Sequence, residues 1–341
     1  MRLFILTIFA IVLSFSSCTK NELLNTNDSS KGFWLVDIND IIHFNSSYNK
    51  IKSLDSPYFL PITDFNIDES TEVIAYSYNN IVHAYPLSAL SIHEIINDSI
   101  GDNYFAVSHC PLTSSTLAWN RFLDGKVNSF GVSGKLYKEN LIPYDRNTES
   151  HWSQMLSLCI NGDFVGETSQ TSQLVRTKFS TLKAASPDAL FLFHTECDST
   201  SCTPNLKSVE DNPVDGGNSG IVASERYFGV VDRNSAVLIP LSGTSDALSL
   251  NTFTAFSKNL IYVSGTDYDL HLVFETGGRS FIVAQNSLPV IMKDNSGNEY
   301  DIFGNVIAGP DKGRRLSSPT AYSAHTFAWE DLFDKKEVIK F

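Results

Sequence analysis

Short runs of β-branched and aromatic residues recur along the chain and are separated by polar turns. The first clear pair is 73–78 and 81–85, and two asparagines, Asn79 and Asn80, join them. Two such runs with a two-residue asparagine turn between them predict a β-hairpin.

The spacing of apolar residues changes after the hairpin. Pro86 precedes a segment, 87–97, in which apolar residues recur at helical spacing, and His93 falls on the edge of the apolar face. Proline at the start of a helix loses no hydrogen bond. We therefore predict a helix over 87–97.

Alternating segments after this helix predict a group of strands. A strand at 105–108 delivers His109 and Cys110 at its end, and Pro111 ends it. Side chains on a strand alternate between faces, so His109 and Cys110 point to opposite sides unless Pro111 bends the chain. Further strands are expected at 115–122 and 127–132, with a tight turn at 123–126.

Three other segments carry weaker patterns. We expect a strand or short helix over 33–44 and a loop over 56–61. Residues 130–137 contain two glycines and a lysine, but they lack the spacing of a phosphate-binding loop, so a glycine-based β-turn is favoured there.

The pattern of the N-terminal half returns further along the chain. Pro86-Leu87 corresponds to Pro240-Leu241 at an offset of 154 (240 minus 86), and 104–108 corresponds to 260–264 at an offset of 156. Asn161-Gly162 corresponds to Ala308-Gly309 at an offset of 147. The offsets keep their order, so we predict a tandem duplication of a β-rich unit.

The fold class expected from these patterns is α+β, mostly β, with short helices. The first repeat spans 33–196, a connecting loop spans 197–222, and a degenerate second repeat spans 223–341. Where the first repeat has Ser108-His109-Cys110-Pro111, the second has Ser264-Gly265-Thr266-Asp267, so it keeps the pattern and loses the reactive groups.

The N-terminus indicates where the protein resides. An apolar run from Leu3 to Phe15 follows Arg2 and is too short to span a bilayer. Small residues then precede Cys18, which resembles the lipobox of bacterial lipoproteins; an ordinary secretory signal is the alternative. The resemblance implies a signal peptide at 1–17 and acylation of the Cys18 thiol and amine, for example by palmitate. The residues that follow are polar and rich in asparagine and serine, so we expect a tether at 18–32.

Charge limits the partners of the chain. There are 38 acidic against 25 basic residues, giving a net charge of −13, while hydrophobic residues make up 42%. Phosphate backbones and anionic lipids repel such a surface, so nucleic acid is not an expected partner. We expect membrane attachment through the lipid on Cys18, on the periplasmic or outer face of the bacterial cell envelope.

Four cysteines follow Cys18. Cys197 and Cys202 lie in a polar, turn-rich segment, where an extracytoplasmic protein can form a local disulfide. Cys159 sits in an apolar run and is expected to be a buried hydrophobic residue. Cys110 is the cysteine with polar neighbours.

Several readings of Cys110 stay open. Cys110 with His93 or His109 has the residues of an activated thiol nucleophile, because an imidazole lowers the pKa of a nearby thiol. Cys110, His93 and His151 also have the donor atoms for zinc or copper. The third reading is a buried free cysteine. Because His109 and Cys110 point to opposite faces of the strand, His93 or His151 is the favoured partner of Cys110.

A second set of candidate residues follows Cys110 along the chain. Lys135 and Tyr137 lie in the glycine-containing segment, and Asp145, Arg146 and Glu149 lie in the next polar cluster. These are candidate ligand-binding residues, with Arg146 best suited to an anion. An arginine between carboxylates more often forms a structural ion pair.

These residues also carry a family resemblance. The chain resembles the bacterial family of domain of unknown function 3179 from about Trp34 to Trp329. The resemblance rests on four strings: Tyr85-Pro86-Leu87 with His93-Glu94-Ile95, Cys110-Pro111-Leu112, 130–137, and 144–154. It implies no established activity. Many members have Cys-Pro-x-Cys where this chain has Thr113, which argues against a dithiol or two-thiolate role here.

Two classes of function remain. One is a cell-envelope lipoprotein with a Cys/His site in the first repeat, either metal-binding or nucleophilic. The other is a non-catalytic binding or scaffold lipoprotein whose repeats pack together and form a groove. The sequence does not decide whether the protein is an enzyme.

Overall fold

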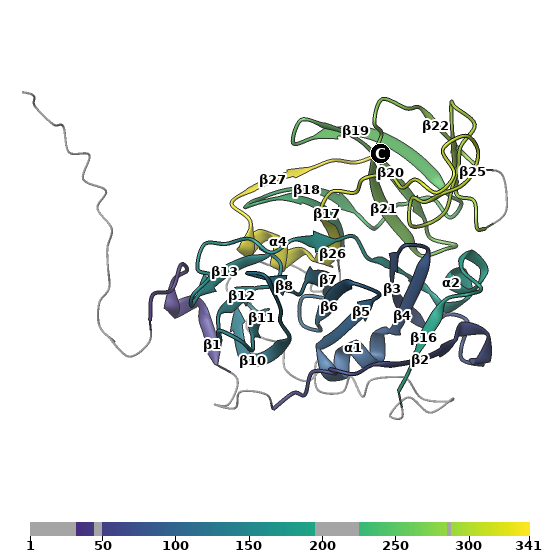
Figure 1. The fold of residues 1–341 in the computed structure, drawn as a ribbon. Helices are drawn as coiled ribbons and strands as arrows, with labels where there is room; N and C mark the ends of the chain where they lie inside the picture. Colours follow the sequence, from purple (N-terminus) through teal and green to yellow (C-terminus); the bar gives the residue numbers. More distant parts are fainter. Residues whose placement is uncertain (1–31, 44–49, 195–224, 285–287) are drawn as a thin grey trace, which may run out of the picture. The chain divides into compact units, whose positions relative to one another are not determined.

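The fold consists mostly of β-strands with a few short helices (Figure 1). A computed structural model describes residues 32–43, 50–194, 225–284 and 288–341. The mostly β fold class expected from the sequence is therefore confirmed.

The predicted hairpin is strands β3 (Glu72–Tyr78) and β4 (Ile81–Pro86). Asn79 and Asn80 turn the chain with φ angles of 49° and 63°. Positive φ at both positions is the geometry of a type I′ turn, which asparagine tolerates well. This hairpin lies in a five-stranded sheet of order β15-β3-β4-β16-β2, with β2 at Tyr58–Pro61, β15 at Val175–Lys178 and β16 at Leu190–Phe193.

Helix α1 (Leu87–His93) begins after Pro86 as predicted but ends four residues early. Glu94 takes the left-handed conformation with φ 56° and ends the helix. The β-branched residues Ile95 and Ile96 then enter strand β5 (Ile95–Ile100), which pairs with β6. The strand preference of these isoleucines outweighs the helical spacing.

Strand β6 (Asn103–Cys110) ends at Pro111, as predicted. It lies in a sheet of order β14-β7-β6-β5, with β7 at Ser115–Asn120 and β14 at Thr171–Ser172. The turn at 123–126 is also confirmed, since β8 (Phe122–Leu123) pairs with β9 (Lys126–Val127) across it.

The expectations for 127–137 are right only in part. The strand expected at 127–132 is split, and 130–137 is strand β10 (Phe130–Tyr137), not a turn. Gly134 has φ 71° within an irregular stretch between Val132 and Leu136, so the glycine serves a bulge inside a strand. The sheet has the order β1-β10-β11-β12-β13, with β1 at Ile41–His43, β11 at Asn140–Asp145, β12 at His151–Ser153 and β13 at Leu158–Asn161.

Two N-terminal segments complete this half. Residues 33–44 contain both expected elements, a 3₁₀ helix η1 (Ile38–Asp40) and strand β1. The loop expected at 56–61 is wrong in part, because Tyr58–Pro61 forms edge strand β2, followed by the 3₁₀ helix η2 (Ile62–Asp64). Pro61 fits there because an edge strand tolerates a missing donor.

The C-terminal half has three sheets of its own. One has the order β26-β17-β18-β27, the second β19-β20-β21 and the third β22-β23-β24-β25. Their bounds are β17 Arg226–Asp232, β18 Ser235–Pro240, β19 Ser249–Ala255, β20 Lys258–Gly265, β21 Leu270–Glu275, β22 Phe281–Val283, β23 Met292–Asp294, β24 Glu299–Tyr300, β25 Val306–Ala308, β26 Ala321–His325 and β27 Lys335–Val338.

The two halves share an order of strands. In the N-terminal half, β15 leads through helix α2 (Phe179–Ala185) to β16, which runs parallel to β4. In the C-terminal half, β26 leads through helix α4 (Thr326–Leu332) to β27, which runs parallel to β18. When the hairpin β5–β6 is matched to the hairpin β19–β20 by their paired residues, equivalent positions are 155 residues apart. The sequence comparison of 104–108 with 260–264 gave 156. Common descent of the halves stays a prediction.

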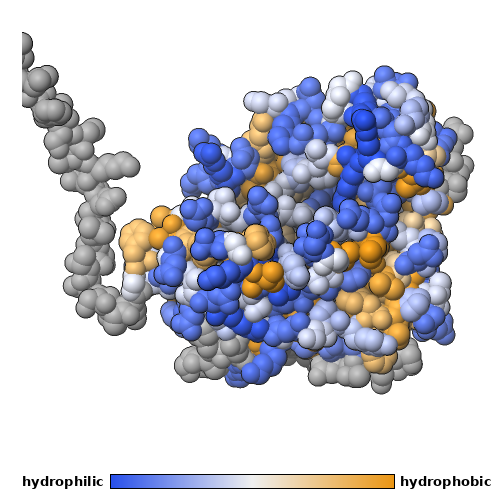
Figure 2. All heavy atoms as spheres, viewed as in Figure 1, coloured by the Kyte–Doolittle hydropathy of each residue, from blue (hydrophilic) through white to orange (hydrophobic). Residues whose placement is uncertain are grey.

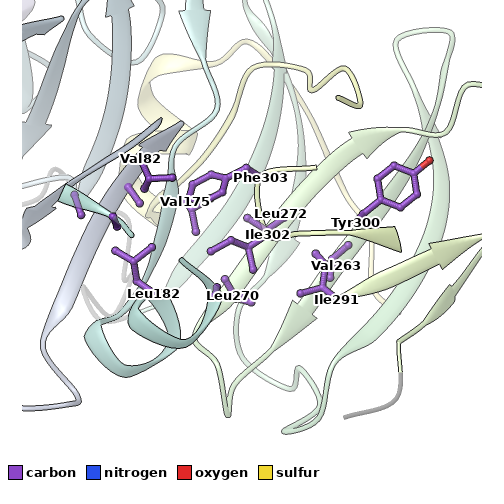
Figure 3. Packing of buried hydrophobic residues seen from close by; sticks show 14 of the residues in the cluster. Val82, Val175, Leu182, Val263, Leu270, Leu272, Ile291, Tyr300, Ile302 and Phe303 are labelled. Atoms are coloured by element: carbon purple, nitrogen blue, oxygen red, sulfur yellow. The ribbon is translucent and has the colours of Figure 1, made fainter. Parts of the chain in front are cut away.

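Residues of both halves form shared hydrophobic cores. One core joins Val82, Val175 and Leu182 to Leu270, Ile302 and others of the C-terminal half (Figure 3). A second core joins Trp119 and Trp152 to Tyr322 and Trp329. Residues Phe33–Phe341 accordingly form one compact unit.

Several expectations concern residues outside the described part of the chain. These are the signal peptide at 1–17, the tether at 18–32 except its last residue, the connecting loop at 197–222, and the Cys197–Cys202 disulfide. Within the described ranges, no helix is both long and apolar enough to cross a membrane.

Candidate functional site

Cys110 lies at the end of β6, and its side chain is buried. Only 2% of the residue is exposed, and it belongs to the core that contains Trp119 and Trp152. Its thiol donates to the carbonyl oxygen of Glu139 at 3.6 Å. Burial raises the pKa of the Cys110 thiol, and the charge of Glu94 raises it further, although contacts with Thr113 and Leu141 lower it. A thiol of this kind is not activated.

His109 points away from Cys110, as strand alternation predicts. Its Nδ1 lies 2.9 Å from the hydroxyl of Thr116 and 3.2 Å from the carbonyl oxygen of Ser115. Burial lowers the pKa of His109 to about 3, and the positive charge of Arg176 adds to the effect. His109 is therefore neutral at physiological pH, and it faces a different part of the molecule from the thiol.

The structure gives Cys110 neither of the predicted imidazole partners. His93 directs Nδ1 to the carbonyl oxygen of Lys52 at 2.6 Å and Nε2 to Nε2 of His194 at 2.7 Å. His151 lies 2.8 Å from the Lys135 amine. Burial and the charge of Lys135 lower the pKa of His151 to about 4. The expected pairing of Cys110 with His93 or His151 is wrong, because both rings are held by other groups.

The expected metal ligands Cys110, His93 and His151 do not come together either. In the described part of the chain, no group of three or more histidine, cysteine, aspartate or glutamate residues could hold a metal ion.

Polar side chains fill the space where a second cysteine would lie. The Thr113 hydroxyl is 2.8 Å from the Ser115 hydroxyl, and the Asn140 amide donates to both. Ser115 also donates to Gln154 at 2.6 Å. All four side chains are fully buried. Because the hydrogen bonds of this network are satisfied internally, it stabilises the hairpin around Cys110.

The second set of sequence candidates makes structural contacts. Asp145 accepts hydrogen bonds from the Thr148 backbone and hydroxyl at 2.8 Å and from the Trp152 indole at 3.3 Å. Arg146 donates to Asp55 at 2.6 Å. These bonds hold the loop between β11 and β12 in place. Glu149 is exposed at the tip of this loop.

Lys135 and Tyr137 both lie on β10. Burial lowers the pKa of Lys135 and raises that of Tyr137. The Tyr137 ring packs against core residues such as Ile142, and the Lys138 ammonium lies 5.7 Å from its centre. Neither residue lines the cavity described below.

A charged cavity lies where the two halves meet, and the sequence did not indicate it. We name it the inter-half cavity. It encloses about 30 Å³ of space and combines two arginines with an aspartate, a histidine and apolar side chains. Its lining residues come from β3, β7, β15, β17, β21, β26 and the adjoining loops: Ile74, Thr116, Leu174, Arg176, Arg226, Phe228, Leu241, Asp269, His271, Ala321, Tyr322 and Ser323.

The two arginines differ in how they are paired. Arg176 holds Glu72 with two of its nitrogens at 2.8 and 2.9 Å and donates to the Ser114 carbonyl at 3.0 Å. Arg226 approaches Glu72 only at 3.9 Å. Burial and the charge of Arg176 lower the pKa of Arg226, although Glu72 and Asp269 oppose this. The guanidinium of Arg226 is thus the less satisfied of the two.

Two further groups set the electrostatics of the cavity. Burial, followed by the charges of Arg226 and Arg176, lowers the pKa of His271 to about 4. Its Nδ1 lies 2.6 Å from the Tyr262 hydroxyl. Burial raises the pKa of Asp269, and the charge of Glu72 raises it further. At neutral pH the imidazole of His271 is therefore neutral beside the guanidinium groups of Arg226 and Arg176.

Two lining residues of the C-terminal half, His271 and Arg226, are related by the internal offset to residues of the N-terminal half, of which Thr116 also lines the cavity. Thr116 corresponds to His271 at 155 (271 minus 116), and Glu72 corresponds to Arg226 at 154 (226 minus 72). Alignment of the halves would have pointed to these positions. It would not have shown that they face one cavity, because that depends on how the sheets pack.

Comparison with known protein families identifies the family of the chain. A model of the family described as Protein of unknown function (DUF3179) matches residues 48–336, which is 289 of 341 residues. The chain belongs to this family. No curated protein and no solved structure matches it.

Proposed function

We propose that this protein is a lipid-anchored envelope protein that binds a small anionic molecule in the inter-half cavity, without covalent chemistry at Cys110. The observation that carries the proposal is the guanidinium of Arg226. It lines a cavity formed by both halves, and its ion pair with Glu72 is long, at 3.9 Å.

An anion fits this guanidinium better than a neutral ligand. Arginine offers a planar fork of donors that matches carboxylate and phosphate oxygens. Arg176 adds positive charge from strand β15 of another sheet but is already bonded to Glu72 and Ser114. When the Tyr262 hydroxyl donates to Nδ1 of His271, the ring proton is on Nε2, and His271 becomes a further donor.

The size of the cavity limits the bound group. A buried water needs about 10–15 Å³ by this measure, so 30 Å³ holds about two oxygen-sized atoms. A carboxylate has two oxygens. We infer that the cavity takes the carboxylate of a small molecule whose remaining atoms extend toward solvent.

The lipid anchor is the second part of the proposal. It rests on the apolar run at 3–15 and on the small residues before Cys18. Acylation at Cys18 would hold the chain at the envelope membrane without a spanning helix. Mass spectrometry of the mature protein tests this part: acyl chains on an N-terminal Cys18 support it, and a free N-terminus elsewhere contradicts it.

A reactive thiol is the competing function. In its favour, burial raises the pKa of Glu94 to about 7, in the range of a general base, and its charge acts on Cys110. Against it, Cys110 is 2% exposed and its own pKa is raised. The burial of the sulfur favours binding over a reactive thiol, because a nucleophile must reach its substrate.

Thermal unfolding with added ligands tests the binding function. Small carboxylates such as acetate and succinate should raise the Tm of the purified protein, whereas acetamide at equal concentration should not. A ligand at 100 times its Kd stabilises a protein by about 2.7 kcal/mol. The Cys110→Ala variant should respond like the parent. Equal responses to acetate and acetamide would contradict anion binding.

A further inference from the structure

An exposed group of large apolar side chains lies at the start of the described chain. We name Phe33, Leu35, Ile38 and Ile42 the N-terminal apolar patch. Their exposed fractions are 59%, 44%, 41% and 43%. Figure 2 shows apolar surface over this region, around η1. Contiguous apolar side chains on a surface mark a site that contacts something else.

The backbone that carries the patch is fixed to the body of the protein. Trp34 and Val36, which alternate with Phe33 and Leu35, pack against a core that contains Ile41 and Ile142. The Leu35 amide donates to the carbonyl oxygen of Ile160 at 2.8 Å. The patch is therefore presented outward by residues that are themselves well packed.

We propose that the N-terminal apolar patch rests on the surface of the membrane that holds the lipid anchor. This inference rests on the proposed acylation of Cys18. From Cys18 to Gly32 there are 14 residues after the cysteine (32 minus 18), which span at most about 50 Å when fully extended. The anchor therefore keeps the patch within about 50 Å of the bilayer.

Charge indicates which lipid surface the patch contacts. Asp37 and Asp40 lie among its apolar residues and are exposed. Anionic head groups would repel these carboxylates. The partner is therefore a zwitterionic bilayer, into whose interface Phe33 and the aliphatic side chains insert, as amphipathic segments do.

A fluorescent label at the patch tests the inference. Ile42→Cys is made in the full acylated protein, with Cys197 and Cys202 replaced by serine, and is labelled with an environment-sensitive dye. The control is Ile282→Cys on β22, where the exposed fraction is 67%. Both are reconstituted in phosphatidylcholine vesicles, with and without nitroxide-labelled lipid.

The expected result is a blue shift and nitroxide quenching at position 42, with no change at position 282. An unchanged spectrum at position 42 in protein that floats with the vesicles would overturn the inference and leave the anchor intact. A blue shift at position 42 without vesicles would also overturn it, since protein would then cover the patch. If the protein carries no acyl chains and does not float with the vesicles, both this inference and the lipoprotein proposal are wrong.

Discussion

Tyr300 donates its hydroxyl to the carboxylate of Asp294 across 2.6 Å. The corresponding loop of the N-terminal half has Trp152, which donates its indole N–H to Asp145 at 3.3 Å. In both loops a buried aspartate accepts from nearby backbone amides and from an aromatic donor on the next strand. The two halves thus stabilise this turn in the same way with different aromatic residues.

Asp294 should stabilise the fold in a pH-dependent manner. Burial alone would raise its pKa, but hydrogen bonds from Tyr300, Asn298 and Ser296 lower the pKa to about 2, from an ordinary value of 3.8. A lowered pKa means that the stabilisation is full above pH 4 and is lost as pH falls through 2. Asp294→Asn should lower the free energy of unfolding by about 1–3 kcal/mol at pH 7.

Urea unfolding of both proteins at pH 7 and pH 2 measures this effect. The difference between parent and variant should shrink at pH 2, where about half of the parent carboxyl is protonated. Tyr300→Phe serves as a comparison that removes a single hydrogen bond and keeps the ring. A difference that stays the same from pH 7 to pH 2 would refute the role of the ionised carboxylate.

Anion binding in the inter-half cavity should strengthen as pH falls below neutral. Burial raises the pKa of Asp269, so its negative charge is lost on acidification earlier than for an ordinary aspartate. His271, with a pKa of about 4, gains a positive charge at still lower pH. Both changes favour an anion beside Arg226.

Calorimetric titration of acetate between pH 7 and pH 5 checks this direction. Asp269→Asn should bind acetate more tightly than the parent at pH 7, and its affinity should change less than that of the parent on acidification. The affinity is corrected for the protonation of acetate itself. If the parent then binds acetate more weakly at pH 5 than at pH 7, the proposed electrostatic effect of Asp269 and His271 is wrong.

Cys110 should react slowly with thiol reagents in the folded protein. Its 2% exposure and raised pKa leave little accessible thiolate at pH 8. Peptide mass spectrometry after alkylation should find Cys110 modified only after denaturation, and Cys159, which is also buried, gives a second internal reference. Rapid native modification at Cys110 would instead favour the reactive-thiol function.

Local chemistry allowed much of the N-terminal fold to be predicted. The asparagine turn at 79–80, the helix start after Pro86 and the strand end at Pro111 each depend on neighbouring residues. The end of α1 at His93 was missed, because pairing of Ile95 with Ser108 across two strands outweighs the helical pattern. The continuation of strand β10 over 133–137 was missed, because the glycines of 130–137 resemble those of a turn.

The site was harder to predict than the fold. Strand alternation correctly separated His109 from Cys110, since that is a local property of the backbone. The pairing of His93 with His194 joins residues 101 positions apart, and Arg226 meets Glu72 across 154 positions. Such contacts depend on how the sheets pack, and residue types along one sequence do not show this.

The acetate affinity of Arg226→Gln, measured by calorimetry at pH 7, tests anion binding in the inter-half cavity most directly. Hydrogen bonds to a charged group contribute about 1.5–3 kcal/mol, so the affinity should fall by roughly 10- to 100-fold. Arg279→Gln is the matched control, because Arg279 is exposed to 30% against 29% for Arg226, pairs with Asp294 and does not line the cavity. Affinity retained in Arg226→Gln, or lost equally in both variants, would contradict the account.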